Sequence, residues 1–261
     1  MFVIPVIMTR RMSRGLEVRI ILFAALLAFS SQVWGFTIPE RLEYEVSFAG
    51  IPAGRAVQEV TQSGNDIHIV STARSAKWLN YFFRVEDRIE SVLSAGTPPI
   101  VLGTPHLFRE RISEGRTRYQ KDAVFDRQNM EVVTRDFLNK SETTHKISSQ
   151  TYDTLSGFYY FRTIGLQVGK SSFIEIFDCK KLWNTEVQVL RREEIEIALG
   201  RFQTVVIRPI LRSEGIFART GDLHIWLTDD DRRIPVMMKS EVKIGSITAI
   251  LVGGSYWPQK K

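Results

Sequence analysis

The chain alternates apolar and polar residues over much of its length beyond position 40. In residues 41–48 every second residue, from Leu42 to Phe48, is apolar, and the residues between them are charged or polar. A period of two residues is typical of a half-buried β-strand, because successive side chains point to opposite faces of a sheet. A turn with glycine and proline follows, and two more strands are predicted at 56–61 and 67–72. Three strands joined by short turns predict an antiparallel meander.

The same pattern returns through most of the remaining chain, with glycine, proline and polar residues between the segments. It predicts strands at residues 87–94, 101–102, 107–112, 117–121, 124–126, 131–135, 172–177, 183–191, 193–198, 202–209, 221–228, 236–244 and 247–252. The polar stretch 139–150 is predicted to be a loop. Residues 42–60 and 187–208 are loosely alike, each reading as strand, turn and strand, which leaves open a fold made of two similar halves.

Residues 151–164 break this pattern and predict a central helix. Apolar residues from Leu155 to Phe161 recur at helical spacing. Thr151 or Asp153 can cap the start of the helix, and Gly165 can end it. Because the segment is apolar around most of its circumference, we expect the rest of the protein to enclose it. The predicted fold is therefore mainly β: a strongly curved antiparallel sheet or barrel-like meander around one central helix near 151–164, with two similar halves as an open alternative.

Residues 1–35 have the composition of a secretory signal peptide. Four arginines precede an apolar run at 20–29, and small and polar residues then lead to Gly35. The run has ten residues, whereas a membrane-spanning helix needs about twenty. We expect cleavage near Gly35–Phe36, export to the periplasm, and a mature part, 36–261, that forms a single antiparallel β domain. The alternative is a protein anchored by an uncleaved N-terminal helix.

Charge and cysteine content narrow the expected partners. The formal net charge is +6; four arginines and Glu17 give residues 1–35 a charge of +3, which leaves +3 for the remainder. That remainder shows no basic stripe, so nucleic acid is not an expected partner. Cys179 is the single cysteine, so no internal disulfide can form. Neighbouring lysines can lower the pKa of this thiol, although an inert turn cysteine is the simpler interpretation.

Motifs that carry chemistry are missing from the sequence. The four histidines show no zinc spacing, and the run Asp229–Asp231 is followed by arginines, which favours a solvated turn over a calcium loop. The Gly-x-Ser-x-Gly elbow and glycine-rich phosphate loops are absent. We therefore expect no cofactor or metal and assign no catalytic residue. A hydrolase with two carboxylates remains open, because a sequence does not report the distance between acids.

Two aromatic clusters are the strongest candidates for a ligand site. One surrounds Trp78, Phe82 and Phe83, and the other contains Phe158 and Tyr159. The simplest interpretation is that both belong to the core. The functional alternative is a cavity between sheet and helix that holds an apolar ligand. The candidate ligand-binding residues are then Trp78, Phe82, Phe83, Phe158, Tyr159 and Arg162.

Arg162 lies on the same predicted helical face as Phe158. Burying its charge without a partner costs free energy. Its charge can be met by an acid such as Asp153 or Asp229, or by an anionic group of the ligand. Structural pairing with an acid is the simpler of the two hypotheses.

Several short stretches together resemble one known family. They are Leu42-x-Tyr44 with Gly50-Ile51 and Ala53-Gly54, Phe125-Asp126, Asp153-x-Leu155-Ser156 leading to Tyr159 and Arg162, Gly200-x-Phe202 ahead of Pro209, and Ile225–Asp230 followed by Arg233-x-Pro235-Val236 and Gly245. With them the chain resembles a bacterial exported family known as domain of unknown function 3108. The resemblance implies a mostly β envelope protein and supplies no activity. Its structural signature here is Asp153, Trp226, Asp229, Arg233 and Pro235.

The leading functional hypothesis is a non-enzymatic envelope protein that binds an apolar or amphiphilic envelope molecule, such as a lipid, or a protein partner. The alternatives are a hydrolase acting on an envelope polymer and a purely structural envelope scaffold. A binder predicts an elongated, mostly apolar cavity lined by residues such as Phe82, Phe158 and Tyr159. A hydrolase predicts converging titratable groups with shifted pKa values. A scaffold predicts a filled core.

Overall fold

The computed structural model describes residues 35–96, 102–210, 222–242 and 245–257, all of which belong to one unit of the chain, 33–261. The predicted signal peptide lies outside the described residues, apart from Gly35 at its end. Within the described part of the chain, no helix is long and apolar enough to span a membrane.

The first half of the domain is an up-and-down series of eight strands. They are β1 (Glu40–Phe48), β2 (Ile51–Ser63), β3 (Asp66–Ser75), β4 (Glu86–Ala95), β5 (Leu102–Glu114), β6 (Thr117–Asp126), β7 (Glu131–Asp136) and β8 (Ser141–Lys146). A short 3-10 helix, η1 (Leu79–Tyr81), lies between β3 and β4. Each consecutive pair of these strands is antiparallel, and we call this series the first meander.

The second half begins with one short strand and the helix. It contains β9 (Thr151–Asp153), α2 (Thr154–Phe161), β10 (Ser171–Phe177), β11 (Leu182–Ile197), β12 (Gly200–Pro209), β13 (Leu223–Thr228), β14 (Pro235–Val242) and β15 (Gly245–Gly254). Strands β10 to β15 are again consecutive antiparallel neighbours and form the second meander, whereas β9 pairs with β10 in parallel.

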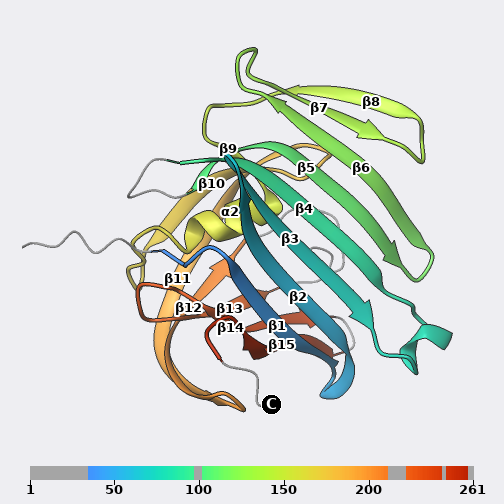
Figure 1. The fold of residues 1–261 in the computed structure, drawn as a ribbon. Helices are drawn as coiled ribbons and strands as arrows, with labels where there is room; N and C mark the ends of the chain where they lie inside the picture. Colours follow the sequence, from blue (N-terminus) through green and yellow to red (C-terminus); the bar gives the residue numbers. More distant parts are fainter. Residues whose placement is uncertain (1–34, 97–101, 211–221, 243–244, 258–261) are drawn as a thin grey trace, which may run out of the picture. The chain divides into compact units, whose positions relative to one another are not determined.

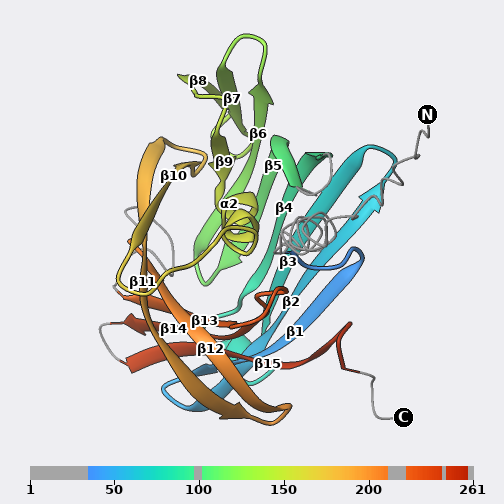
Figure 2. The same cartoon turned by 90° about the vertical axis from the view of Figure 1, so that its left-hand side faces the viewer.

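The two meanders join into one sheet because β1 pairs with β15, with Tyr44 opposite Leu251. The resulting sheet of fifteen strands runs in the order β8 to β1 and then β15 to β9, so it stays open at β8 and β9. Figures 1 and 2 show the sheet curving around α2, with the first meander on one side of the helix and the second on the other. The predicted mainly β, strongly curved antiparallel sheet around one central helix is confirmed. A duplication of two similar halves stays a prediction.

Helix α2 is shorter than the predicted 151–164 at both ends. Residues 151–153 pair with β10 as strand β9, and the helix ends at Phe161 with Arg162 as its C-cap, so Gly165 does not end it. Of the two predicted caps, Thr151 and Asp153, Asp153 caps the helix: its Oδ1 accepts hydrogen bonds from the backbone N–H groups of Leu155 (2.9 Å) and Ser156 (2.8 Å). The Ser156 hydroxyl accepts the Asp153 N–H in return (3.1 Å), which completes a capping box. The start of the helix is therefore fixed by local chemistry that the sequence displays.

The prediction of a loop at 139–150 is wrong in part, because Ser141–Lys146 forms strand β8. This strand pairs with β7, with Thr134 opposite Thr143. Its side chains are polar and mostly exposed. An edge strand is held by backbone hydrogen bonds on one side only and needs no apolar face. Hydrophobic alternation therefore cannot reveal such a strand.

The helix divides the interior of the curved sheet into two apolar clusters. Leu155 and Tyr159 pack against the first meander, in a cluster that includes Ile69 and Phe108. Phe161 packs with second-meander residues of the other cluster. A third cluster includes buried residues of β1 and β12 to β15, among them Leu42, Tyr44, Val206, Trp226, Val236 and Leu251. The helix is therefore enclosed, as its apolar circumference predicts.

Candidate functional site

A cavity of about 400 Å³ lies between helix α2 and the concave faces of both meanders. One wall of this cavity is formed by the helix and the second meander and is mostly apolar. Its apolar residues are Leu155, Gly157, Phe158 and Phe161 of α2, with Ile176, Val187, Ile207, Leu223, Ile225 and Met238 of the strands. The volume falls within the range of roughly 300–1,000 Å³ that is usual for small-molecule sites.

The opposite wall belongs to the first meander and carries most of the polar groups. Its polar residues are Gln58, Ser71, Asp87, Glu110, Glu114, Tyr119 and Lys121. Successive side chains alternate across a strand, so Glu110, Ile112 and Glu114 of β5 all face the same side. The cavity therefore has a mostly apolar wall, which also carries Asp178 and Lys180, facing a wall with carboxyl, amide, hydroxyl and ammonium groups.

Glu110 is the most strongly perturbed acid of the cavity. Burial raises the pKa of its carboxyl to about 7, and the nearby Asp178 and Asp153 act in the same direction. The ammonium group of Lys121 and a hydrogen bond from the Cys179 thiol oppose this rise. Glu110 therefore keeps its proton to a much higher pH than an ordinary glutamate.

Cys179 lies at the predicted turn with φ of 61° and is buried. Burial raises the pKa of its thiol well above the usual range, and the charge of Glu110 adds to the effect. A thiol made reactive by its neighbouring lysines is therefore not supported: burial dominates, and the lysine that lowers the pKa of Cys179 is Lys121 rather than an adjacent one. Within the described residues no three metal-ligating side chains converge on one point.

Asp87 and Glu114 lie at one end of the polar wall, next to the turn that carries η1. The Ser113 backbone N–H donates to the Asp87 Oδ1 at 2.9 Å. Burial raises the pKa of Asp87, while hydrogen bonds from Ser113 and from the Glu114 side chain lower it. A hydrogen bond between two carboxyl groups needs one shared proton, so this end of the cavity also holds an acid that keeps its proton more readily than usual.

The six predicted ligand-binding residues do not come together in this cavity. Phe158 lines it. Tyr159 is fully buried and contacts the Phe36 ring at a centroid distance of 5.1 Å. Trp78, Phe82 and Phe83 surround η1 and are exposed to solvent, outside the cavity lining. Arg162 also lies outside the lining, in a separate buried cluster.

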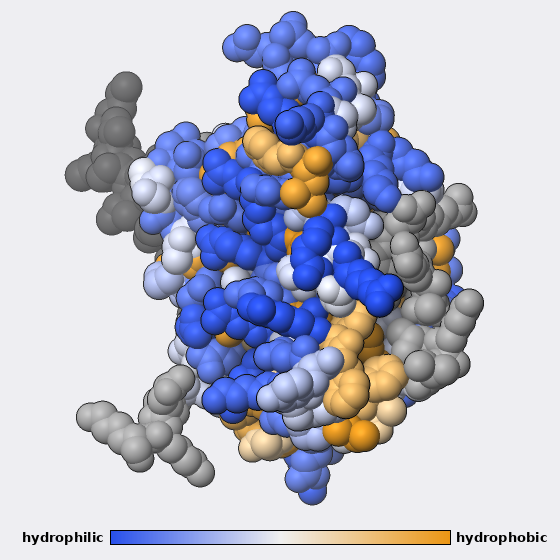
Figure 3. All heavy atoms as spheres, turned by 90° about the vertical axis from the view of Figure 1, so that its right-hand side faces the viewer, coloured by the Kyte–Doolittle hydropathy of each residue, from blue (hydrophilic) through white to orange (hydrophobic). Residues whose placement is uncertain are grey.

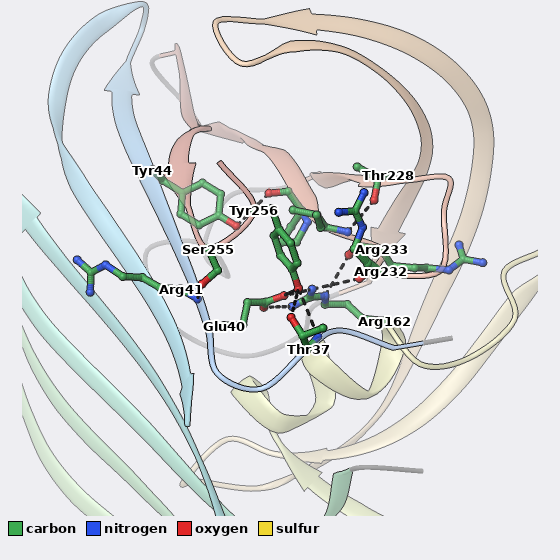
Figure 4. Close-up of polar contacts among 12 residues, drawn as sticks. Thr37, Glu40, Arg41, Tyr44, Arg162, Thr228, Arg232, Arg233, Ser255 and Tyr256 are labelled. Atoms are coloured by element: carbon green, nitrogen blue, oxygen red, sulfur yellow. Dashed lines mark hydrogen bonds and ion pairs between the residues drawn. The ribbon is translucent and has the colours of Figure 1, made fainter. Parts of the chain in front are cut away.

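Arg162 is fully buried and forms a two-pronged ion pair with Glu40 (Figure 4). Its Nη1 and Nη2 atoms lie 2.6 and 2.7 Å from the two carboxylate oxygens of Glu40. The Arg162 Nε donates to the backbone carbonyl of Arg233 at 3.0 Å, and Nη2 donates to that of Arg232 at 3.1 Å. The acid that meets Arg162 is thus Glu40, rather than Asp153 or Asp229.

Further groups complete this buried cluster. The Tyr256 hydroxyl donates to Glu40 at 2.7 Å. The guanidinium of Arg162 lies over the rings of Phe36 and Tyr159, at 4.5 and 5.0 Å from their centroids. The cluster therefore links the start of β1, the end of α2, the turn between β13 and β14, and the residues after β15. The charged groups of Arg162 and Glu40 are satisfied within the cluster, which indicates a structural role.

Glu40 is a residue that the sequence reasoning missed. It occupies the first position of β1 in phase with Leu42 and Tyr44, and all three are buried. A charged residue on the apolar face of an alternating strand indicates a buried partner of opposite charge. That signal was present, but the identity of the partner required the fold, because 122 residues separate the two.

Each residue of the structural signature takes part in a polar contact, through the side chain for Asp153, Trp226 and Asp229 and through the backbone carbonyl for Arg233 and Pro235. Asp153 also accepts a hydrogen bond from the Ser91 hydroxyl at 2.6 Å, which ties the helix cap to β4. The indole N–H of Trp226 donates to Glu193 (2.6 Å), and Asp229 pairs with Arg192 (2.6 Å). The carbonyl of Pro235 accepts the Tyr44 hydroxyl at 2.9 Å, as that of Arg233 accepts Arg162. These contacts connect elements that are distant in sequence.

Together the fold and the site define a class: an open, barrel-like antiparallel sheet with one internal helix and a two-sided cavity. The chain belongs to the family described as protein of unknown function (DUF3108), whose model matches residues 43–252. The chain is similar in fold to a β-barrel-like protein of domain of unknown function DUF1849 from Brucella abortus. That crystal structure aligns with a TM-score of 0.53 and 14% identity, over 84% of this chain and 98% of the other. Among curated proteins no match is found.

Proposed function

We propose that this protein is a non-enzymatic, exported envelope protein that binds one amphiphilic molecule in the cavity beside α2. The observation that carries the proposal is the division of the cavity into an apolar wall with Phe158, Phe161 and Ile225 and a polar wall with Glu110 and Lys121. A single apolar chain fits the first wall, and a polar head group can reach the second. A structural scaffold predicts a filled interior, and the cavity argues against it.

Burial of hydrocarbon supplies enough free energy for such binding. Each buried methylene contributes about 0.8 kcal/mol, so a chain of roughly ten carbons gains about 8 kcal/mol before the cost of association is subtracted. Glu110, with its pKa of about 7, lowers the cost of placing an apolar chain nearby, because its neutral form is well populated. The expected ligand class is an amphiphile with a single chain.

Export is part of the proposal and rests on the sequence. The arginines and the apolar run at 20–29 have the pattern of a signal peptide that ends near Gly35. The described domain begins close to that point, since Phe36 is buried against Tyr159. A ligand from the cell envelope is therefore available where the protein is proposed to be located.

We expect Ser71→Trp to weaken ligand binding at least tenfold, because residue 71 lines the cavity and an indole would fill part of the space between β3 and the second meander. The measurement is fluorescence titration with 11-(dansylamino)undecanoic acid as the probe. Thr72→Trp is the matched control: it adds the same side chain one position along the strand, outside the cavity lining. Equal probe affinities for the two variants, both folded by circular dichroism, would contradict the proposal.

A hydrolase acting on an envelope polymer is the second candidate, and the raised pKa of Glu110 favours it. A carboxyl that titrates near neutral pH suits general acid–base catalysis. We expect Glu110→Gln to bind the dansyl probe within threefold of the unmodified chain if the protein is a binder. If it is a hydrolase, the same variant should lose the release of soluble fragments from isolated cell-wall polymer, which the unmodified chain would show.

A further inference from the structure

Four aromatic side chains project from one end of the first meander. Trp78, Tyr81, Phe82 and Phe83 surround η1, and we call them the aromatic tip. Tyr81 and Phe82 are 88% and 83% exposed, and the other two are also open to solvent. Figure 1 shows η1 extending beyond the ends of the neighbouring strands. Rings of this size are usually buried, so their exposure calls for an explanation.

The aromatic tip is held in place by hydrogen bonds at its base. The Trp78 indole N–H donates to the carbonyl of Pro52 in β2 at 3.0 Å. The Ser75 hydroxyl donates to the Asn80 side chain at 2.6 Å, and the backbone N–H groups of Phe82 and Phe83 donate to the Leu79 carbonyl. The rings are therefore presented to solvent by an ordered turn.

Two neighbouring turns extend the apolar surface of the tip. Ile51, the first residue of β2 after the turn that follows β1, is exposed next to the Pro52 carbonyl that holds Trp78. The Phe83 ring packs on Gly115, in the turn between β5 and β6, so closely that a Cβ there would lie 2.5 Å from the ring. Figure 3, which views the side from which η1 extends, shows apolar residues gathered on the lower part of a largely hydrophilic face.

The rim of this surface is basic. Residues 74–86 and 114–118 contain five cations (Arg74, Lys77, Arg84, Arg116 and Arg118) and two acids (Glu86 and Glu114), a net charge of +3. Arg84 pairs with Glu86 at 2.6 Å, and Arg74 approaches the same carboxylate at 3.9 Å. Lys77, Arg116 and Arg118 are exposed, and each lies within three residues of Trp78 or of Gly115, on which Phe83 packs. The surface therefore combines an aromatic centre with a positive margin.

We propose that the aromatic tip inserts into the interfacial layer of a lipid bilayer with anionic head groups. Trp, Tyr and Phe favour this layer, because their rings are apolar while the Trp and Tyr polar groups reach water and head groups. The basic margin complements anionic lipid at the same depth. An amphipathic surface of this composition lies on a membrane without spanning it.

The position of the cavity agrees with this orientation. Ala73, Asp87 and Glu114 line one end of the cavity, and each lies within a few residues of the tip or of the turn beneath Phe83. A bilayer that receives the tip would therefore face that end of the cavity. The inference goes beyond the proposed ligand binding and does not require it, although the two together place the cavity where an amphiphile can enter.

The test is co-sedimentation of the full chain with vesicles of phosphatidylcholine and phosphatidylglycerol. We expect the double variant Tyr81→Ser/Phe82→Ser to lower the partition coefficient at least tenfold. Phe173→Ser is the matched control, because Phe173 of β10 is a similarly exposed ring (63%) away from the tip. All variants carry the same N-terminal segment, so differences between them report the tip alone.

Two further measurements sharpen the result. The Trp78→Phe variant should lose the blue shift of tryptophan emission that vesicles induce in the unmodified chain, and vesicles of phosphatidylcholine alone should bind severalfold less. The cavity variant Ser71→Trp should keep its vesicle binding, which separates this inference from the proposed ligand site. Equal partition coefficients for the unmodified chain and the double variant would overturn the inference. It would also be overturned if the unmodified chain did not bind vesicles and instead bound a protein through the aromatic tip.

Discussion

Replacing Arg162 with alanine is expected to lower the free energy of unfolding by about 3–5 kcal/mol, the usual range for removing one partner of a buried ion pair. The change leaves the Glu40 carboxylate buried with only the Tyr256 hydroxyl to satisfy it. It also removes the donors to the carbonyls of Arg232 and Arg233. The measurement is urea unfolding followed by tryptophan fluorescence, with the slope checked for two-state behaviour.

The surface pair Arg201–Glu196 supplies the control, because both side chains are 69% exposed. Arg201→Ala should change the free energy of unfolding by less than about 0.5 kcal/mol. The double variant Arg162→Met/Glu40→Leu should recover most of the loss, since replacing both partners removes the stranded charge. If Arg162→Ala lowers the free energy of unfolding by less than about 1 kcal/mol, the cluster does not hold the start of β1 to the residues after β15.

This cluster shows where sequence reasoning ends. The sequence identified Arg162 as a charge on an apolar helical face, and burial confirms it. The acids that the sequence offers as partners do not pair with Arg162: Asp153 is engaged at the helix cap, and Asp229 pairs with Arg192. The pairing of β1 with β15, which positions Glu40 beside Tyr256, is set by packing of the whole chain and has no local signature.

The architecture was more predictable than the cavity. Alternation of period two located most strands, because one face of each strand packs against the helix or the third cluster. It failed at β8, whose polar side chains face solvent. Aromatic density identified both the tip and the helix, but hydrophobicity does not distinguish a buried ring such as Tyr159 from an exposed one such as Phe82. That distinction depends on how far η1 extends beyond the sheet.

Glu110→Gln is expected to stabilise the protein at pH 8 by about 2–3 kcal/mol and to leave stability near pH 4 unchanged. The folded-state pKa of about 7 lies above the ordinary value of 4.5, so the folded protein binds the proton more tightly than the unfolded chain. Stability from this group is therefore fully present below pH 4.5, falls as pH rises towards 7, and stays low above it. Glutamine mimics the neutral carboxyl and removes that loss.

The measurement is urea unfolding of both proteins at intervals from pH 4 to pH 8.5. Glu196→Gln is the control, because this glutamate is largely exposed and its substitution should shift the whole pH profile by less than about 0.5 kcal/mol. A difference between Glu110→Gln and the unmodified chain that stays constant with pH would mean that the carboxyl is solvated in the folded state. The polar wall would then face open water. Glu110 would not be a buried carboxyl of the cavity, and the ligand proposal would lose that support.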